Sequence, residues 1–251
     1  MFNYTEYTNI INLIKQNLPI IDFADVNAHT EKFCVIRHDI EFSIDRAVKL
    51  AELEKKLGIK TTYTVQLRNN TYNALSEKNI EAIHYIKGLG HCIALHQNPP
   101  LMPKKDLIDY VLKDIETLEH YYGFEIDRYA FHRPKQEQLK MYLEIPGKIN
   151  LYGKKYFHYF DGRKPTNMEV TYLADSNHEW KYGHPMGLDF QTAKNPYGKI
   201  KKLQLNLHPF SWSKNGYEKY GNFLSLIEER KKEMLYDMES ENKAFPKELL
   251  L

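Results

Sequence analysis

The sequence predicts an α/β fold, a deformed (β/α) barrel of seven strands in a single domain. Short runs rich in β-branched and aromatic residues alternate with amphipathic helical segments, which is the pattern of a parallel sheet with covering helices. The 251 residues, 42% of them hydrophobic, suffice for one large core. Most predicted strands also stop at a polar or ionisable residue, as expected of strands that end around the mouth of a barrel.

The first half of the chain shows the alternation of strands and helices clearly. The run KFCVIRH predicts the first strand, and residues 43–58 predict a helix that Ser43 caps and Gly58 ends. KTTYTVQ, HCIALH and RYAFH predict the next three strands. The helices between them are predicted over residues 76–87 and 104–122, and Gly123 ends the second of these helices.

The second half carries a weaker signal. INLYG, VTYLAD and KLQLNLH predict three more strands, and the segments between them are rich in Gly, Pro, Asn and aromatic residues, which indicates long loops. The last strong helix is predicted over residues 217–239. We therefore expect one barrel domain over residues 1–251, with an N-terminal helical extension over 1–30 and a C-terminal helix over 217–240.

Charge and composition narrow the class of partner. The 35 basic and 33 acidic residues are spread along the chain. The sequence therefore shows no basic cluster of the kind that binds nucleic acid or an anionic membrane. We expect a small-molecule or oligosaccharide substrate. The oligomeric state stays open. Cys34 and Cys92 lie in apolar strand-like runs typical of reduced core thiols. Without a signal peptide pattern or an apolar run of roughly 18 residues, the chain is predicted to be cytoplasmic with no membrane span.

The polar residues at the predicted strand ends indicate a metal-assisted hydrolase. These residues are Asp39 and Glu41, Gln66, His96, His132 with Arg133, Asp175, and His208. A barrel would gather them around one mouth, although polar strand ends that simply meet water are the alternative. Carboxylates and imidazoles without thiolates suit Zn²⁺ or a similar divalent ion with an open position for water. Asp39 and His208 are candidates for the base and the acid that such chemistry needs.

Five segments in chain order carry a family resemblance. They are RHDIEFSIDRAVKLAELEKKLGIKTTYTV, GLGHCIALHQNP, FHRP, YLADSNHEWKYGHP and LQLNLHP, and they span about residues 33 to 212. In combination they resemble the polysaccharide deacetylase superfamily (NodB-like), in its divergent branch with an Arg-His-Asp-Val-Asp first motif. The resemblance implies a deformed barrel, often with seven strands. It also implies metal-dependent removal of an N-acetyl or related acyl group from a sugar or sugar-containing precursor in surface-polysaccharide biosynthesis.

The resemblance also assigns roles to individual residues. Asp39 matches the base, Arg133 the arginine that orients the base, and His208 the histidine that protonates the leaving amine. His96 matches the first metal histidine, and Glu41 stands where the branch has its second aspartate, a candidate ligand. The residues expected to bind substrate are Arg37, His38, Asp175, Trp180 and Trp212.

The chain departs from the family pattern at the metal site. The family places a second metal histidine four positions after the first, and Pro100 stands there in this sequence. A third ligand must then come from elsewhere, and the candidates are Glu41, His132 and His38. His91 begins its strand and is expected at the opposite end of the barrel. The departure leaves two alternatives open: a non-catalytic barrel that binds glycans or nucleotide sugars, and a hydrolase that acts on another amide or ester bond of a sugar.

Overall fold

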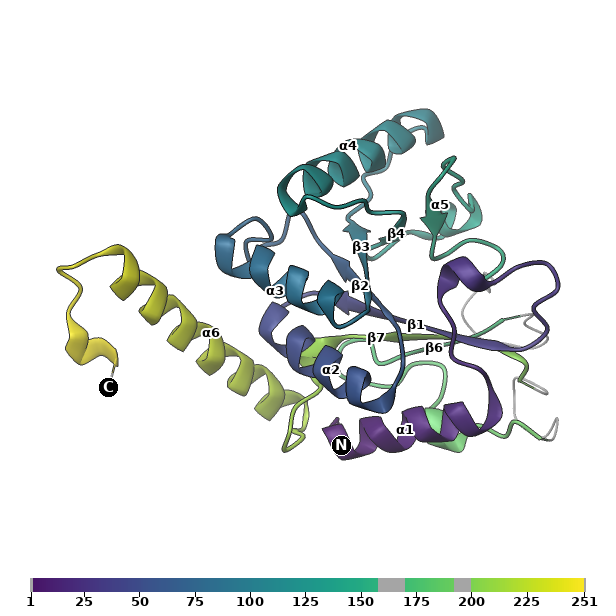
Figure 1. Cartoon of the computed structure of the whole chain (residues 1–251), viewed down its shortest axis with the longest axis horizontal. Coiled ribbons are helices and arrows are strands. Elements are labelled where there is room, and N and C mark those ends of the chain that lie inside the picture. The colour runs from purple at the N-terminus through teal and green to yellow at the C-terminus, as the bar shows by residue number, and fades with distance from the viewer. Residues whose placement is uncertain (1, 158–169, 192–199, 251) are drawn as a thin grey trace.

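A computed structural model describes residues 2–157, 170–191 and 200–250 of the chain. Within these ranges one fully parallel sheet has the strand order β5-β4-β3-β2-β1-β7-β6. Its strands are β1 (Phe33–Ile40), β2 (Thr62–Val65), β3 (Cys92–Gln97), β4 (Arg128–Phe131), β5 (Ile149–Asn150), β6 (Thr171–Ala174) and β7 (Lys202–Leu207). No described residues pair β5 with β6, so the strands curl into a half-barrel with two edges (Figure 1). The predicted seven-stranded α/β barrel fold is confirmed.

The helices begin and end where the sequence places caps. They are α1 (Tyr4–Asn17), α2 (Ile44–Leu57), α3 (Glu77–Gly88), α4 (Lys104–Tyr122), α5 (Gln136–Lys140) and α6 (Lys219–Glu241). At the start of α2, the Ser43 hydroxyl accepts a hydrogen bond from the Arg46 amide at 3.2 Å. Gly58 and Gly123 follow α2 and α4 with φ of 67° and 68°, the left-handed conformation that glycine adopts without strain.

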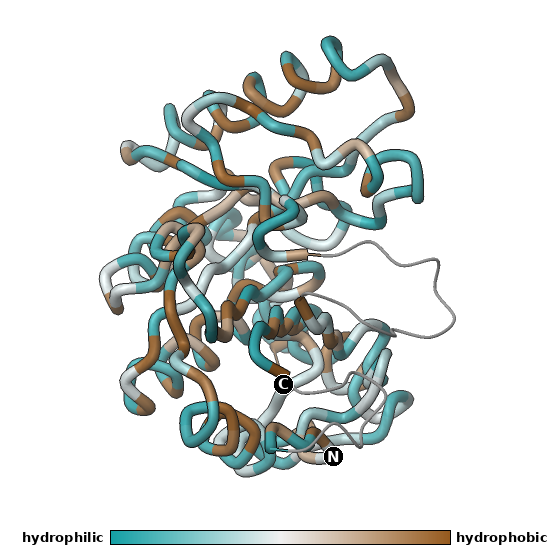
Figure 2. Tube along the Cα trace, turned by 90° about the vertical axis from the view of Figure 1, so that its right-hand side faces the viewer, coloured by the Kyte–Doolittle hydropathy of each residue, from teal (hydrophilic) through white to brown (hydrophobic). Residues whose placement is uncertain are grey.

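Helices α2, α3 and α4 cover the outer face of the sheet. Polar and apolar residues alternate along the helical turns of the chain (Figure 2), and the buried residues of these three helices are mostly apolar. The apolar stripe of α2, with Ile44, Ala47 and Leu50, is fully buried. Burial of a leucine or isoleucine side chain contributes roughly 1.5–3 kcal/mol, so this stripe holds α2 in place beside β1. Cys34 and Cys92 are free thiols, Cys34 in the core and Cys92 half-buried.

Helix α6 is attached to the body mainly through its first turns. Asn222 and Leu226 are its buried residues, and the Arg46 guanidinium on α2 donates to the Asn222 side chain at 2.7 Å. Beyond them α6 projects away from the sheet (Figure 1), and Ile227 and Met234 are exposed. The expected helix at the C-terminal end therefore exists, but its later turns do not cover the barrel. No helix in the described ranges has the length and apolar character needed to cross a membrane.

Candidate active site

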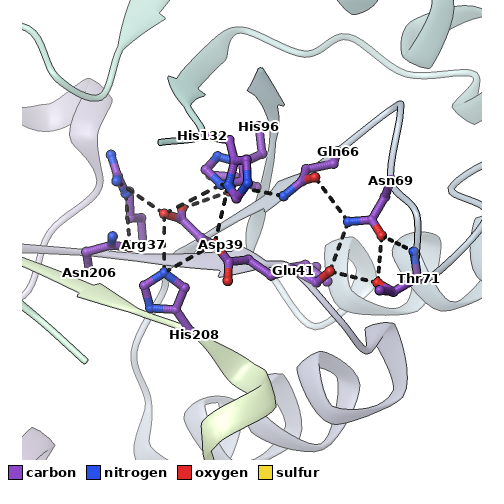
Figure 3. A network of polar contacts seen from close by, with 12 residues as sticks. Arg37, Asp39, Glu41, Gln66, Asn69, Thr71, His96, His132, Asn206 and His208 are labelled. Carbon is purple, nitrogen blue, oxygen red and sulfur yellow. Dashed lines mark hydrogen bonds and ion pairs between the residues drawn. The ribbon is translucent and has the colours of Figure 1, made fainter. Parts of the chain in front are cut away.

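Polar side chains at a spacing of two residues build the inner face of the half-barrel. Residues two apart on a strand share a face, and β1, β2 and β7 carry polar residues at this spacing up to the carboxyl end of the sheet. They are Arg37, Asp39 and then Glu41 along β1, Thr64 and Gln66 along β2, and Asn206 and His208 along β7. These strand ends converge on one cavity of about 630 Å³ (Figure 3). Asp39, His96 and His208 all line it, which confirms the prediction that they share one cavity.

Asp39 is a buried carboxylate held by two donors. Its Oδ2 lies 3.2 Å from Nη2 of Arg37, and its Oδ1 accepts a hydrogen bond from the Thr64 hydroxyl at 2.9 Å. Burial opposes ionisation, but the charge of Arg37, with that of His208 and the hydrogen bond of Thr64, outweighs it and holds the pKa of Asp39 well below its usual range. Oδ2 lies 3.8 Å from Nε2 of His96 and 4.0 Å from Nε2 of His208. Asp39 is thus ionised at neutral pH and faces both imidazoles.

Arg37 orients Asp39 from inside the half-barrel. Its Nε donates to Oδ1 of Asn206 at 3.1 Å, and its Nη2 donates to the Tyr152 hydroxyl at 2.5 Å. The guanidinium also stacks over the Tyr152 ring at 4.1 Å from the ring centroid. The side chain is fully buried and does not line the cavity. Arg37 thus positions the Asp39 carboxylate and does not itself reach the cavity.

The expected contact of Arg133 with Asp39 is not formed in the described part of the chain. Arg133 is exposed, lines the mouth of the cavity and has a left-handed backbone with φ of 47°. The partner of Asp39 is Arg37 because these two residues share a strand and a face of the sheet. Arg133 follows β4 and belongs to the loop that rims the cavity.

His208 is paired with a second buried carboxylate, Asp175. Nδ1 of His208 lies 2.7 Å from Oδ1 of Asp175, and the indole N–H of Trp212 donates to the other Asp175 oxygen at 2.7 Å. Burial disfavours the imidazolium, but the hydrogen bond and charge of Asp175, with the charges of Glu41 and Asp39, raise the pKa of His208 to about 9. His208 is therefore protonated at neutral pH. Its Nε2 lies in the cavity, 3.8 Å from Oε1 of Glu41.

Glu41, His96 and His132 bring three potential metal-binding atoms together. The three atoms lie within 4.8 Å of one another. Nδ1 of His132 lies 3.1 Å from Nε2 of His96 and 3.3 Å from Oε1 of Glu41. Burial lowers the pKa of His96 to about 4, so its ring is neutral and able to bind a metal. Two imidazoles and one carboxylate are a ligand set that Zn²⁺ accepts, so the residues present fit a divalent ion.

Hydrogen bonds outside this set fix the backbone of Glu41. The Asn69 amide and the Thr71 hydroxyl each donate to the Glu41 carbonyl at 2.9 Å. Burial opposes ionisation of the Glu41 carboxyl, but its hydrogen bond to His132 and the nearby histidines lower its pKa. Pro100 does not belong to the set, and its carbonyl accepts a hydrogen bond from the Gln138 amide at 3.1 Å. The second imidazole of the set comes from His132, which follows β4.

None of the five residues expected to contact substrate lines the cavity. His38 is on the outer face of β1, because it alternates with Arg37 and Asp39, and its Nε2 lies 2.8 Å from Oε1 of Glu54. Asp175 and Trp212 are fully buried behind His208. The Trp180 ring stacks on Phe2 at 5.9 Å between centroids. These four, like Arg37, do not line the cavity, so the structure corrects their expected contact with substrate.

The sequence does not identify which aromatic residues line the cavity. This aromatic lining consists of Phe131, Tyr152, Phe157, Tyr172 and Tyr182. Tyr172 occupies a β6 position that shares the cavity side of the sheet with Asn206, and its hydroxyl accepts a hydrogen bond from the Asn206 amide at 3.0 Å. The sequence feature that marks this face of the sheet is the spacing of two residues between side chains on the same side of a strand. Thr64 and Asn206 stand two residues before the polar strand ends Gln66 and His208, and so belong to the same face.

Comparison with known proteins finds likeness in the fold. No family model and no curated protein matches the chain. A chitin deacetylase structure from the fungal pathogen Colletotrichum lindemuthianum is 14% identical, with a TM-score of 0.42 over 84% of this chain and 86% of that one. A CE4 family pseudoenzyme from Bacillus anthracis is 13% identical, with a TM-score of 0.45 over 86% and 68%. A peptidoglycan deacetylase from Bdellovibrio bacteriovorus is 11% identical, with a TM-score of 0.42 over 85% and 53%. The chain is similar to these proteins in fold, at identities too low to transfer an activity.

Proposed function

We propose that the protein is a metal-dependent hydrolase that removes an N-acetyl or related acyl group from a sugar or sugar-containing precursor. One observation carries the proposal. An ionised carboxylate, Asp39, and a protonated imidazole, His208, face the same cavity as the ligand set of Glu41, His96 and His132. Together these groups would supply the base, the acid and the metal ligands needed to hydrolyse a C–N bond other than a peptide bond. The sequence resemblance favours a precursor of a surface polysaccharide as the substrate.

Glu41, His96 and His132 would hold the metal, and Zn²⁺ matches this ligand set. When bound, a divalent ion would polarise the acyl carbonyl and bring the pKa of the attacking water towards neutrality. His96 would not have to lose a proton to bind the metal at neutral pH, because burial already keeps its ring neutral. The buried Nδ1 of His96 forms no hydrogen bond with described residues.

Asp39 and His208 would divide the proton transfers. The oxygen of water bonds to the acyl carbon while its proton passes to Oδ2 of Asp39, which Arg37 holds in place. Nε2 of His208 then gives its proton to the nitrogen as the C–N bond breaks, leaving the free amine and the carboxylic acid. Asp175 stabilises the imidazolium before this transfer and fixes the orientation of the ring.

The aromatic lining suits a sugar ring. Tyr152, Phe157 and Tyr172 line the cavity next to the polar residues, and aromatic faces pack well against the apolar faces of pyranose rings. A different amide or ester bond on a sugar would use the same machinery. The other class of function, a barrel that binds glycans or nucleotide sugars without catalysis, predicts binding but no release of acid.

Acetate release tests the proposal. Wild-type protein with Zn²⁺, Mn²⁺ or Ni²⁺ is incubated with a panel of N-acetylated sugars and sugar precursors, and free acetate is measured. Asp39→Asn and His208→Gln remove the base and the acid, and each should lower the rate by about 10²- to 10⁴-fold. Asp109→Asn changes the same chemical group on the exposed face of α4 and should leave the rate unaltered. Sugar binding without metal-dependent acetate release would instead favour the non-catalytic barrel.

A further inference from the structure

The mouth of the cavity carries two cations that have no acidic partner in the described part of the chain. Arg133 and Lys181 both line the cavity, and both are exposed. Arg133 follows β4, whereas Lys181 lies in the loop after β6, so the two reach the mouth from different parts of the sheet. Neither forms an ion pair with a described carboxylate, and the nearby Glu179 is paired with Lys219.

The carboxylates deeper in the cavity have cationic neighbours of their own. Among the described lining residues the carboxylates are Asp39 and Glu41. Asp39 is paired with the Arg37 guanidinium at 3.2 Å, and Oε1 of Glu41 lies 3.8 Å from Nε2 of the protonated His208. The imidazolium of His208 is balanced by Asp175, its partner at 2.7 Å. Arg133 and Lys181 therefore form no ion pair with a described carboxylate of the cavity, and their charges make the mouth locally positive.

The backbone around these two cations is in a costly conformation. Arg133, Asn177 and Tyr182 line the cavity and have positive φ of 47°, 60° and 67°. Such conformations cost non-glycine residues free energy and gather at ligand sites, where the surrounding structure holds them. The amide of Lys181 donates to the Ala174 carbonyl at 2.7 Å, which ties this loop to the end of β6. Lys181 thus lies on a loop that is hydrogen-bonded to the sheet.

We propose that the cavity mouth binds an anionic group of the substrate, a phosphate or a carboxylate, with Arg133 and Lys181 as its counter-charges. The inference rests on the proposed function for the acylated sugar itself. The acyl group would lie at Asp39 and His208, the sugar ring along the aromatic lining, and the anion at the mouth. The substrate class is then a negatively charged N-acetyl sugar, such as a sugar phosphate or an acidic sugar.

Binding to metal-free protein tests the subsite without requiring turnover. Calorimetry on chelator-treated protein compares N-acetylglucosamine, N-acetylglucosamine 1-phosphate and N-acetylmuramic acid, which carry no charge, a phosphate and a carboxylate. We expect at least one charged sugar to bind about tenfold or more tightly than the neutral one, since a charge-assisted contact exceeds a neutral one by this amount. The preference should weaken as salt is added. The charged sugar that binds more tightly identifies the source of the anion.

The double variant Arg133→Gln/Lys181→Gln should lose this preference and keep its affinity for the neutral sugar. The matched control Lys55→Gln/Lys56→Gln removes two exposed charges at the carboxyl end of α2 and should keep the preference. Equal affinities for charged and neutral sugars, or no binding of either charged sugar at millimolar concentration, would overturn the proposal. A preference lost equally in both double variants would also overturn it. Acetate release is measured separately, so failure of hydrolysis with an intact preference contradicts the proposed function and leaves the anion subsite standing.

Discussion

Asp175 sets the acid–base behaviour of His208 without reaching the cavity. Its carboxylate is fully buried and bridges Nδ1 of His208 and the indole N–H of Trp212, each at 2.7 Å. Because Nδ1 is occupied in this way, Nε2 is the ring atom that lies in the cavity. The raised pKa of His208, about 9, keeps at neutral pH the proton that the proposed mechanism transfers to the amine.

The first prediction concerns the pH dependence of activity. A group that must be protonated loses its contribution as pH rises through its pKa, so wild-type kcat/KM should fall above about pH 9. Asp175→Asn removes the charge that stabilises the imidazolium, and this fall should move to lower pH by about one to two pH units. The measurement is a pH profile of acetate release. Trp212→Phe keeps the carboxylate and should keep the fall near pH 9, and an unmoved profile in Asp175→Asn would contradict the role.

For single residues, the sequence predicts which side chains lie at the candidate site better than it predicts which residues they contact. Asp39, His96 and His208 are predictable because each stands at the end of a hydrophobic run, and parallel strands bring such ends together. The choice of Arg37 over Arg133 as the partner of Asp39 is not visible in a motif. Both arginines adjoin conspicuous motif residues, and only the shared face of β1 decides between them.

At the scale of elements, one buried carboxylate joins helix α2 to the sheet. Oε1 of Glu54 accepts from the Tyr7 hydroxyl of α1 and lies 2.8 Å from Nε2 of His38 on β1. Oε2 accepts from the Thr61 and Tyr63 hydroxyls at 2.7 and 2.6 Å. Burial opposes its ionisation, but the charge and hydrogen bond of His38 and the other contacts lower the pKa of Glu54. His38 therefore holds the strand that carries Asp39 from its outer side.

Removal of this carboxylate should destabilise the fold. Glu54→Ala leaves buried hydroxyls and an imidazole without their acceptor, and we expect a loss of about 3–5 kcal/mol in the free energy of unfolding. Glu81→Ala removes an exposed carboxylate on α3 and should change this energy by less than about 0.5 kcal/mol. Urea unfolding at neutral pH measures both. Equal losses in the two variants would contradict the role of Glu54.

Comparison of wild type with Glu54→Ala also tests the direction in which pH changes the free energy of unfolding. A carboxyl whose pKa is lowered by folding stabilises the native state above its unfolded pKa, about 4.3, and loses that contribution as pH falls through the folded value. The difference in unfolding free energy between wild type and Glu54→Ala should thus be greatest near neutral pH and shrink below about pH 4. A difference that grows on acidification would show that Glu54 is protonated in the folded protein.

The ends of a helix are predicted well from the sequence where its apolar periodicity is long and a capping residue follows it. The predicted bounds of α4 coincide with the observed Lys104–Tyr122, because its apolar periodicity is long and Gly123 ends it. The projection of α6 is not visible in the sequence, since a helical pattern with apolar residues predicts a helix but not the neighbour that covers it. The opening between β5 and β6 is likewise a property of tertiary pairing. His158, for which no sequence motif predicts a role, lies outside the described residues.

At the scale of the whole molecule, the ligand set connects strands that are distant in sequence. Glu41 follows β1, His96 lies on β3 and His132 follows β4, so an ion held by all three would cross-link three of the seven strands. The unfolded chain does not hold these groups together. Anything that binds the native state alone stabilises it against unfolding, and the stabilisation depends on ligand concentration.

The last prediction is that Zn²⁺ raises the stability of the whole domain through these three residues. At a free concentration one hundredfold above the dissociation constant, the free energy of unfolding should rise by about 2.7 kcal/mol in the wild type. His96→Ala and His132→Ala each remove one of three ligands and should lose most of this gain, because a catalytic zinc site commonly uses three protein ligands. His120→Ala removes an exposed imidazole on α4 and should keep it. Thermal unfolding with and without Zn²⁺ measures all four proteins. If the wild type gains nothing at millimolar Zn²⁺, Mn²⁺ or Ni²⁺, the site holds no ion and the metal-dependent hydrolase is excluded. If all four proteins gain equally, the ion binds elsewhere and the ligand assignment is wrong.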